Sequence, residues 1–385
     1  MSGSDQAAEH LRQYLRKLSP QVRGRLLAEL ERLHLLGEDI PHSEPLIAAL
    51  RAEFRSTGQS DYRVGNPSRY FFEPIEPVLV DGAPERANAG QIARGTLAPI
   101  WSLLTEKLLP SMAADYVAQA KTAIAAENRE EARRIAASFR KKMLTYLDGV
   151  LGTAAGEANV RAGLSAYTSS HAAFEGLEKV LRFMRMQQEL ADFSRGLAPR
   201  IAKLDGLVLS KVMDALAALK MKRIDALPFA LTIVARRLET PWELILLATN
   251  PSGSRSAAVI AKSPYAAAVS MVLDQIEDQR LSLRAALNNN RVMQAKEIVG
   301  QIYKFESALT ERIDLKESDW DGRLCNLMAA VQSTLDAEIN SIPTDHLHLM
   351  HVLESPSLRP HSVGGRIGRL FEKGRAALTG AGKPR

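Results

Sequence analysis

The chain lacks what a disulfide-stabilised protein needs. Its 385 residues include one cysteine, Cys325, so no disulfide forms within the chain. Nothing in the cysteine content therefore indicates an oxidising compartment. We interpret Cys325 as a small apolar residue of a helix, because it lies in the apolar run GRLCNLMAAV.

Long hydrophobic runs are missing as well. The most apolar stretches, Leu227–Ala235 and Trp242–Ala248, are far shorter than the roughly 18 residues of a membrane span. The first residues, MSGSDQAAEHLRQYLRK, lack the apolar centre of a secretory signal. We therefore expect core helices in a cytoplasmic protein.

Aromatic residues and strand patterns are scarce. Phe, Trp and Tyr make up 5% of the chain, whereas alanine and leucine are abundant. Such a composition favours helices that pack through small and aliphatic side chains. The only strand candidate is VLV, residues 78–80, which is too short to build a sheet. The predicted fold class is all-α, with a multi-helix bundle-like or irregular helical-hairpin architecture.

Proline, glycine and capping residues divide this helical pattern into segments. Ser19-Pro20, for example, is typical of a helix start, and Gly37 of a helix end. The predicted organisation is N-terminal helices in 1–57, a long Pro/Gly/aromatic connection in 58–95, a central helical domain in 96–249, a linker in 250–263, a C-terminal helical domain in 264–356 and a basic flexible tail in 357–385.

The long connection contains the most unusual stretch, SRYFFEPIEPVLVDG at residues 68–82. We expect Pro74 and Pro77 to hold the segment that follows the aromatic triplet extended, since proline fixes its own backbone and removes a donor. Anchors are needed to offset the ordering entropy of so long a connection. We therefore predict a rigid strap in which Phe71 and Phe72 are buried, at least one of them against the helices that flank Trp101.

A binding lip is the alternative to the strap, with the aromatic side chains lining a groove for a partner. The candidate partner-binding residues are Tyr70, Phe71, Phe72 and Trp101.

Two segments resemble each other. Residues 123–139 and 285–305 both place an Asn-Arg pair between helical patterns, followed by an alanine and, three residues later, an isoleucine. Each lies downstream of a proline and tryptophan pairing, Pro99–Trp101 and Pro241-Trp242. A duplicated helical hairpin is one interpretation of this similarity, although two copies with unequal spacing do not make a repeat array.

Motifs for metals, cofactors and catalysis are weak. On a helix, Asp345, His348 and His351 share one face, but a metal site there would need a further ligand from elsewhere. Glu31 and His34 form only one of the two Glu-x-x-His pairs of a di-iron bundle. No phosphate-binding loop or nucleophile elbow is present in the sequence. We predict no catalytic residue, no cofactor and no metal.

The charge is concentrated at the C-terminus. Residues 359–385 contain seven basic residues and one acidic residue, which equals the formal charge of +6 for the whole chain. As a helix, this tail is basic and amphipathic, so it can contact an anionic membrane or nucleic acid. The candidate contact residues are Arg366, Arg369, Lys373 and Arg375. A disordered, solubilising tail is the other interpretation.

The sequence leaves three functions open. The first is a non-catalytic cytoplasmic interaction or regulatory protein that binds a protein partner. The second is a peripheral membrane or nucleic-acid binder that acts through its basic tail. The third is an enzyme whose site is assembled from residues distant in sequence. The sequence indicates no oligomeric state.

Overall fold

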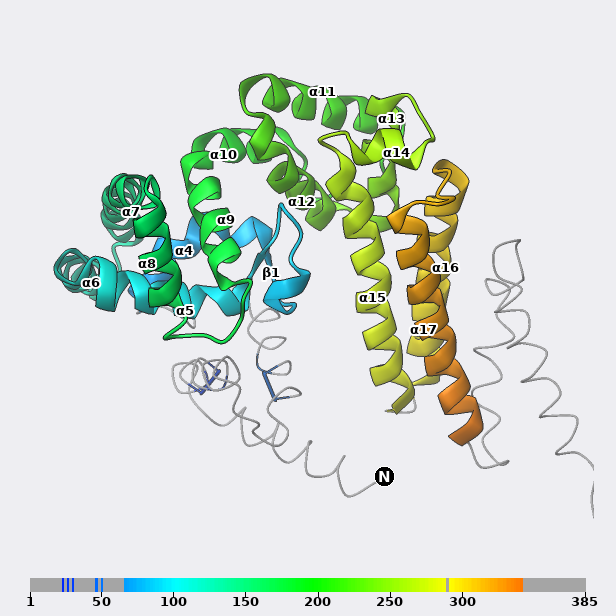
Figure 1. Cartoon of the computed structure of the whole chain (residues 1–385), viewed down its shortest axis with the longest axis horizontal. Helices are drawn as coiled ribbons and strands as arrows, with labels where there is room; N and C mark the ends of the chain where they lie inside the picture. Colours follow the sequence, from blue (N-terminus) through cyan, green and yellow to red (C-terminus); the bar gives the residue numbers. More distant parts are fainter. Residues whose placement is uncertain are drawn as a thin grey trace, which may run out of the picture. The chain divides into compact units, whose positions relative to one another are not determined.

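The computed structural model describes residues 66–288 and 291–341, together with a few residues nearer the N-terminus: Arg23, Leu26, Leu27, Leu30, Leu46, Ile47 and Leu50. Helices dominate these residues, and the only strands among them are two short ones (Figure 1). The predicted all-α class is therefore confirmed.

The chain divides into two compact units by its contacts. The first contains the residues up to Ala87 and Gln91–Gln187, and the second contains Asn88–Gly90 and the residues from Gln188 onward. Three residues of the predicted long connection thus belong to the second unit.

The first unit combines short 3-10 and α-helical turns with longer helices. Its elements are α4 (Pro67–Phe72), η1 (Glu73–Val78), β1 (Leu79–Val80), η2 (Pro84–Arg86), β2 (Ile92–Ala93), η3 (Arg94–Thr96), α5 (Leu97–Ser102), the π-helical turn η4 (Leu103–Leu108), α6 (Pro110–Ala125), α7 (Arg129–Leu151), α8 (Ala154–Leu164) and α9 (Ala173–Arg185).

The stretch around the aromatic triplet is helical, so the prediction of an extended segment after it is wrong. Asn66 caps α4 by accepting a hydrogen bond from the Ser68 backbone N–H, and Pro67 occupies the first turn. Pro74 likewise lies in the first turn of the 3-10 helix η1. A missing N–H costs nothing at these positions, so the prolines start helical turns instead of extending the chain.

The expected strand segment does pair, although over two residues only. β1 and β2 run parallel, with Leu79 opposite Ile92 and Val80 opposite Ala93. Leu79, Ile92 and Ala93 are buried. The pairing closes the segment between Val80 and Ile92 into a loop.

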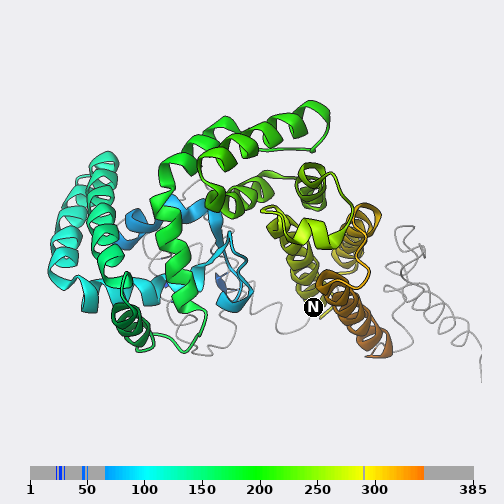
Figure 2. The same cartoon turned by 45° about the horizontal axis from the view of Figure 1, so that its top comes forward.

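Within the described residues, the second unit contains the remaining helices, except that Gln187, the first residue of α10, belongs to the first unit. They are α10 (Gln187–Gly196), α11 (Gly206–Lys222), η5 (Ile224–Ala226), α12 (Leu227–Arg237), η6 (Pro241–Leu244), α13 (Ile245–Ser252), α14 (Ala257–Ala261), α15 (Ala266–Asn288), α16 (Val292–Arg312) and α17 (Asp319–Ser341). The long helices α15, α16 and α17 lie side by side (Figures 1 and 2).

The segment 250–263, for which the sequence predicts a linker, contains regular structure. α13 continues to Ser252 and ends at Gly253, whose φ of 57° is left-handed. Helix α14 then occupies Ala257–Ala261. A left-handed glycine is a common helix end, and here it makes a tight turn between two helices.

The two segments with similar sequences form hairpins with the same turn geometry, α6–α7 and α15–α16. The Asn128 N–H donates to the Ala123 carbonyl at 2.9 Å, and the Arg291 N–H donates to the Ala286 carbonyl at 2.8 Å. Backbone angles agree too, with φ −86° and ψ 82° at Asn128 against φ −93° and ψ 70° at Arg291.

Each hairpin also packs a phenylalanine of its second helix against a tryptophan. The ring centroids are 6.5 Å apart for Phe139 and Trp101, and 5.9 Å apart for Phe305 and Trp242. The matching turn positions are Asn128 and Arg291, so the Asn-Arg pairs of the two segments are offset by one residue, and the duplicated hairpin stays a prediction.

Candidate functional site

The aromatic triplet that the sequence singles out lies in the core. Phe71 is fully buried, and Tyr70 and Phe72 are buried as well. The Phe71 ring is 5.3 Å from Trp101 and 5.5 Å from Phe139, measured between centroids. The predicted burial of Phe71 and Phe72 against the helices around Trp101 is therefore confirmed.

Helical geometry explains how three consecutive aromatic residues are buried together. α4 is a short helix that packs on α7 and also contacts α6. Phe72 contacts Phe71 and Trp101 with edge-to-face rings, at centroid distances of 4.8 and 6.1 Å. Of the four candidate partner-binding residues, only Trp101 is partly exposed. This burial favours the anchoring role, and partner binding by these residues stays a prediction.

Two buried polar side chains fix α4 in place. The Tyr116 hydroxyl donates to the Pro67 carbonyl oxygen at 2.6 Å. A nitrogen of the Arg140 guanidinium donates to the carbonyl oxygens of Tyr70 at 2.8 Å and Phe71 at 3.2 Å. Burial raises the pKa of Tyr116 and lowers the pKa of Arg140. Both side chains donate to backbone carbonyls of α4, so we assign them a structural role.

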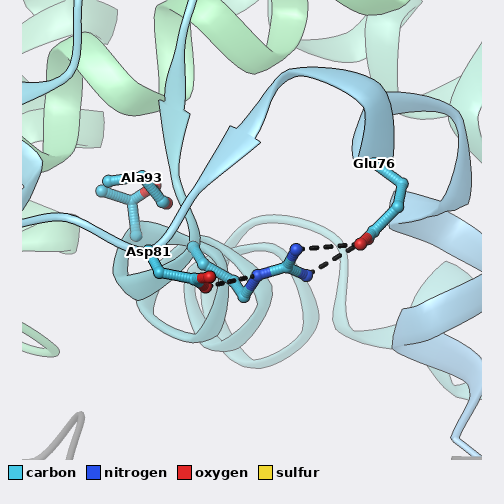
Figure 3. Close-up of polar contacts among 5 residues, drawn as sticks. Glu76, Asp81 and Ala93 are labelled. Atoms are coloured by element: carbon cyan, nitrogen blue, oxygen red, sulfur yellow. Dashed lines mark hydrogen bonds and ion pairs between the residues drawn. The ribbon is translucent and has the colours of Figure 1, made fainter. Parts of the chain in front are cut away.

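Arg94, which follows β2, binds two carboxylates that lie before and after β1 (Figure 3). Its guanidinium binds both carboxylate oxygens of Glu76, at 2.8 and 3.2 Å, and its Nε donates to Asp81 at 3.0 Å. Burial alone would lower the pKa of Arg94, but the bonds to Glu76 and the charge of Asp81 outweigh it and raise the pKa. Both carboxylates are occupied by this one cation, so the cluster stabilises the loop between β1 and β2.

The other sequence candidates fall outside the described residues. These include the tail residues Arg366, Arg369, Lys373 and Arg375, the histidines near the C-terminus, and Glu31 with His34. Within 66–288 and 291–341, no group of three or more His, Cys, Asp or Glu side chains is placed to hold a metal ion. Cys325 is half-buried on α17, next to the Asp321 carboxylate.

None of the helices that the structure describes is both long enough and apolar enough to cross a membrane. The apolar run Leu227–Ala235 lies in the core helix α12, as expected, and its residues are almost all buried.

An exposed face of α11 is the strongest candidate for binding. Its opposite face is fixed in the second unit by Val212, Leu216 and Leu219, which are buried. The outward face nevertheless carries Leu207, 70% exposed, and Met221, 87% exposed. Further exposed apolar side chains in or next to this helix are Val208 and Ile224.

Polar and small residues complete this outward face. Lys211, Asp214 and Ala218 are exposed and lie between Leu207 and Met221 along the helix. Neither Lys211 nor Asp214 has an ion-pair partner among the described residues. We call the set Leu207, Lys211, Asp214, Ala218 and Met221 the α11 face.

Sequence reasoning missed the α11 face. The segment GLVLSKVMDALAALKMK is apolar almost throughout, so its pattern gives no clear division into buried and exposed sides. The residues of the face follow one another from Leu207 to Met221 at alternating steps of four and three. This spacing places them on one side of a helix, and it was the sequence signal that could have identified the face.

No family model matches the chain, and no curated protein and no solved structure is significantly similar to it.

Proposed function

We propose that this chain is a non-catalytic, cytoplasmic interaction or regulatory protein that binds a protein partner through the α11 face. The observation that carries the proposal is the exposure of Leu207 and Met221 on a helix whose other side is held in the core. Leaving a large apolar side chain in water forfeits about 1.5–3 kcal/mol relative to burying it. Burial of both side chains against a partner would recover this free energy.

The polar residues of the face favour a protein over a lipid surface. Asp214 lies in the middle of the row that Leu207 and Met221 delimit. A carboxylate on the side of a helix that enters a bilayer is costly, whereas a protein partner can supply a matching cation. The mixture of apolar ends and charged centre therefore fits a protein surface.

Cross-linking in the native cell tests this function. A photoreactive amino acid placed at Ala218 should form an adduct with a protein under illumination. The adduct should disappear when Leu207→Glu is added, since a carboxylate at the end of the face opposes docking. Met293→Glu is the matched control, because Met293 is 75% exposed on α16 and should leave the adduct unchanged. Absence of any adduct in the unsubstituted background would refute the proposal.

A second candidate function is carried by the charge distribution. The whole formal charge of +6 lies within residues 359–385, which supports binding of an anionic membrane or nucleic acid. Deleting residues 357–385 should then abolish binding to anionic vesicles or to DNA at low salt, and raised salt should weaken the binding of the full chain. If the deletion leaves this binding unchanged, the tail is not the segment that binds vesicles or DNA.

A further inference from the structure

We infer that the partner of the α11 face is a second copy of this chain, whose α11 packs antiparallel across a two-fold axis between residues 212 and 213. This inference rests on the proposed function and identifies the partner. It is carried by the order of side chains from Leu207 to Ala218, which is complementary to itself when reversed. Met221 falls opposite residue 204, beyond the start of α11.

The residues of the face form one straight row. They follow one another at steps of four, three, four and three residues, from Leu207 to Met221. At 100° per residue they fall within an arc of about 80°. Alternating steps of four and three are the spacing by which helices pair along their length. The row extends over most of the 17 residues of α11, so it is long enough for a helix-to-helix contact.

When two copies of α11 lie antiparallel about an axis between residues 212 and 213, opposite charges face each other. Lys211 of each copy then faces Asp214 of the other, which gives two symmetric ion pairs. A two-fold interface is isologous, so a single complementary pair in the sequence is used twice. These are the same two charged residues that have no ion-pair partner among the described residues of one chain.

The same reversal matches large side chains with small ones. Leu207 of each copy lies opposite Ala218 of the other. Both residues are exposed. Large residues over small ones let two helices approach closely, so Leu207 packs over Ala218 while the charges pair between these two contacts.

Other arrangements of the two helices are opposed by charge. A parallel pair in register puts Lys211 opposite Lys211 and Asp214 opposite Asp214. An antiparallel pair centred on residue 214 puts the two Asp214 carboxylates against each other. Like charges in direct opposition reduce affinity, so the register between residues 212 and 213 is favoured.

Charge reversal with sedimentation velocity tests the pairing. The full chain should associate reversibly to a dimer over a concentration series. Lys211→Asp makes both central residues acidic, and Asp214→Lys makes both basic. Each variant alone should weaken the dimer about tenfold or more, because like charges oppose each other at two places.

An equimolar mixture of the two variants should associate again. One copy then presents two acidic residues and the other two basic residues, so every opposed pair is attractive. The mixture also removes misfolding as an explanation, because a misfolded variant would not recover. Met293→Glu should dimerise like the unsubstituted chain.

The outcomes separate this inference from the proposed function. If the unsubstituted chain stays monomeric while cross-linking at Ala218 yields an adduct with a different protein, self-pairing is wrong and the proposed function stands. If the mixture of variants fails to associate although the unsubstituted chain dimerises, the register is wrong. If neither a dimer nor an adduct forms, both proposals fail.

Discussion

The guanidinium of Arg140, on α7, donates a hydrogen bond of 2.8 Å to the backbone carbonyl oxygen of Tyr70, the residue with which the aromatic triplet begins. The carbonyls at the end of a helix have no partner within it, and α4 is only one and a half turns long. A buried cation on a long helix satisfies two of these carbonyls at once. The connection is thus anchored through its backbone as well as through its aromatic rings.

Arg140→Met should destabilise the protein by about 3 kcal/mol, because methionine fills much of the space but leaves two buried carbonyl oxygens without their charged donor. Chemical denaturation measures the loss. Arg133→Met, on the same helix, is the matched control. Arg133 pairs with Glu73 at 2.8 Å on the surface, where an ion pair contributes about 0–1 kcal/mol. Equal effects of the two substitutions would contradict the role of Arg140.

Phe72→Ala should lower the free energy of unfolding by about 3–5 kcal/mol, as expected for truncation of a large core residue. A thermal melt detects this as a reduced Tm. Tyr146→Ala serves as the comparison, since Tyr146 is an aromatic residue of α7 that is 39% exposed. An unchanged Tm of the Phe72 variant, together with weaker binding of a partner, would instead support the binding lip.

Gly90→Ala should destabilise the second unit by about 1–3 kcal/mol, the range for overpacking of a tight contact. A methyl group at Gly90 would lie 1.9 Å from the Pro228 carbonyl oxygen, which is backbone and cannot rotate away. The shift that follows would also disturb the bond of 2.9 Å from the Thr232 hydroxyl to the Gly90 carbonyl.

Gly82→Ala is the control for this position. It lies in the same connection, and a methyl group there would meet no atom within 4 Å. Its effect on the free energy of unfolding should stay within about 0.5 kcal/mol, as for most surface substitutions. Protease resistance of α12 provides a second readout, and it should fall only in the Gly90 variant.

Ser170→Ala should raise the pKa of Glu85 toward its ordinary value. The Ser170 hydroxyl donates to the Glu85 carboxylate at 2.6 Å, and this bond is the largest cause of the lowered pKa. A carboxyl group with a lowered pKa in the folded state adds stability above its unfolded pKa, and that stability disappears as the pH falls through the folded pKa. An NMR titration of the side-chain carboxyl groups measures the change, and a Glu85 pKa that Ser170→Ala leaves unchanged would assign the shift to another cause.

The sequence by itself determined the fold class and several helix starts. Composition and spacing predict helices throughout. Thr240-Pro241 is the same kind of start signal as Ser19-Pro20, and η6 begins at Pro241. These features depend on a few neighbouring residues, through backbone restriction by proline and through capping. The burial of Phe71 and Phe72 was predictable for a related reason, since large aromatic side chains in a helical protein gain most from the core.

Tertiary structure alone decided the rest. Pro74 fits the first turn of a helix as well as it fits an extended chain. Arg140 and Tyr116, which are 70 and 49 residues beyond the carbonyls of Tyr70 and Pro67 that they bind, hold α4 as a buried turn. The exposure of Leu207 and Met221 could not be predicted either, because apolar residues occur on both the buried and the exposed sides of α11 and only packing selects the face that stays in water. Local pattern defines which elements form, whereas contacts between residues distant in sequence decide which of their surfaces remain open to a partner.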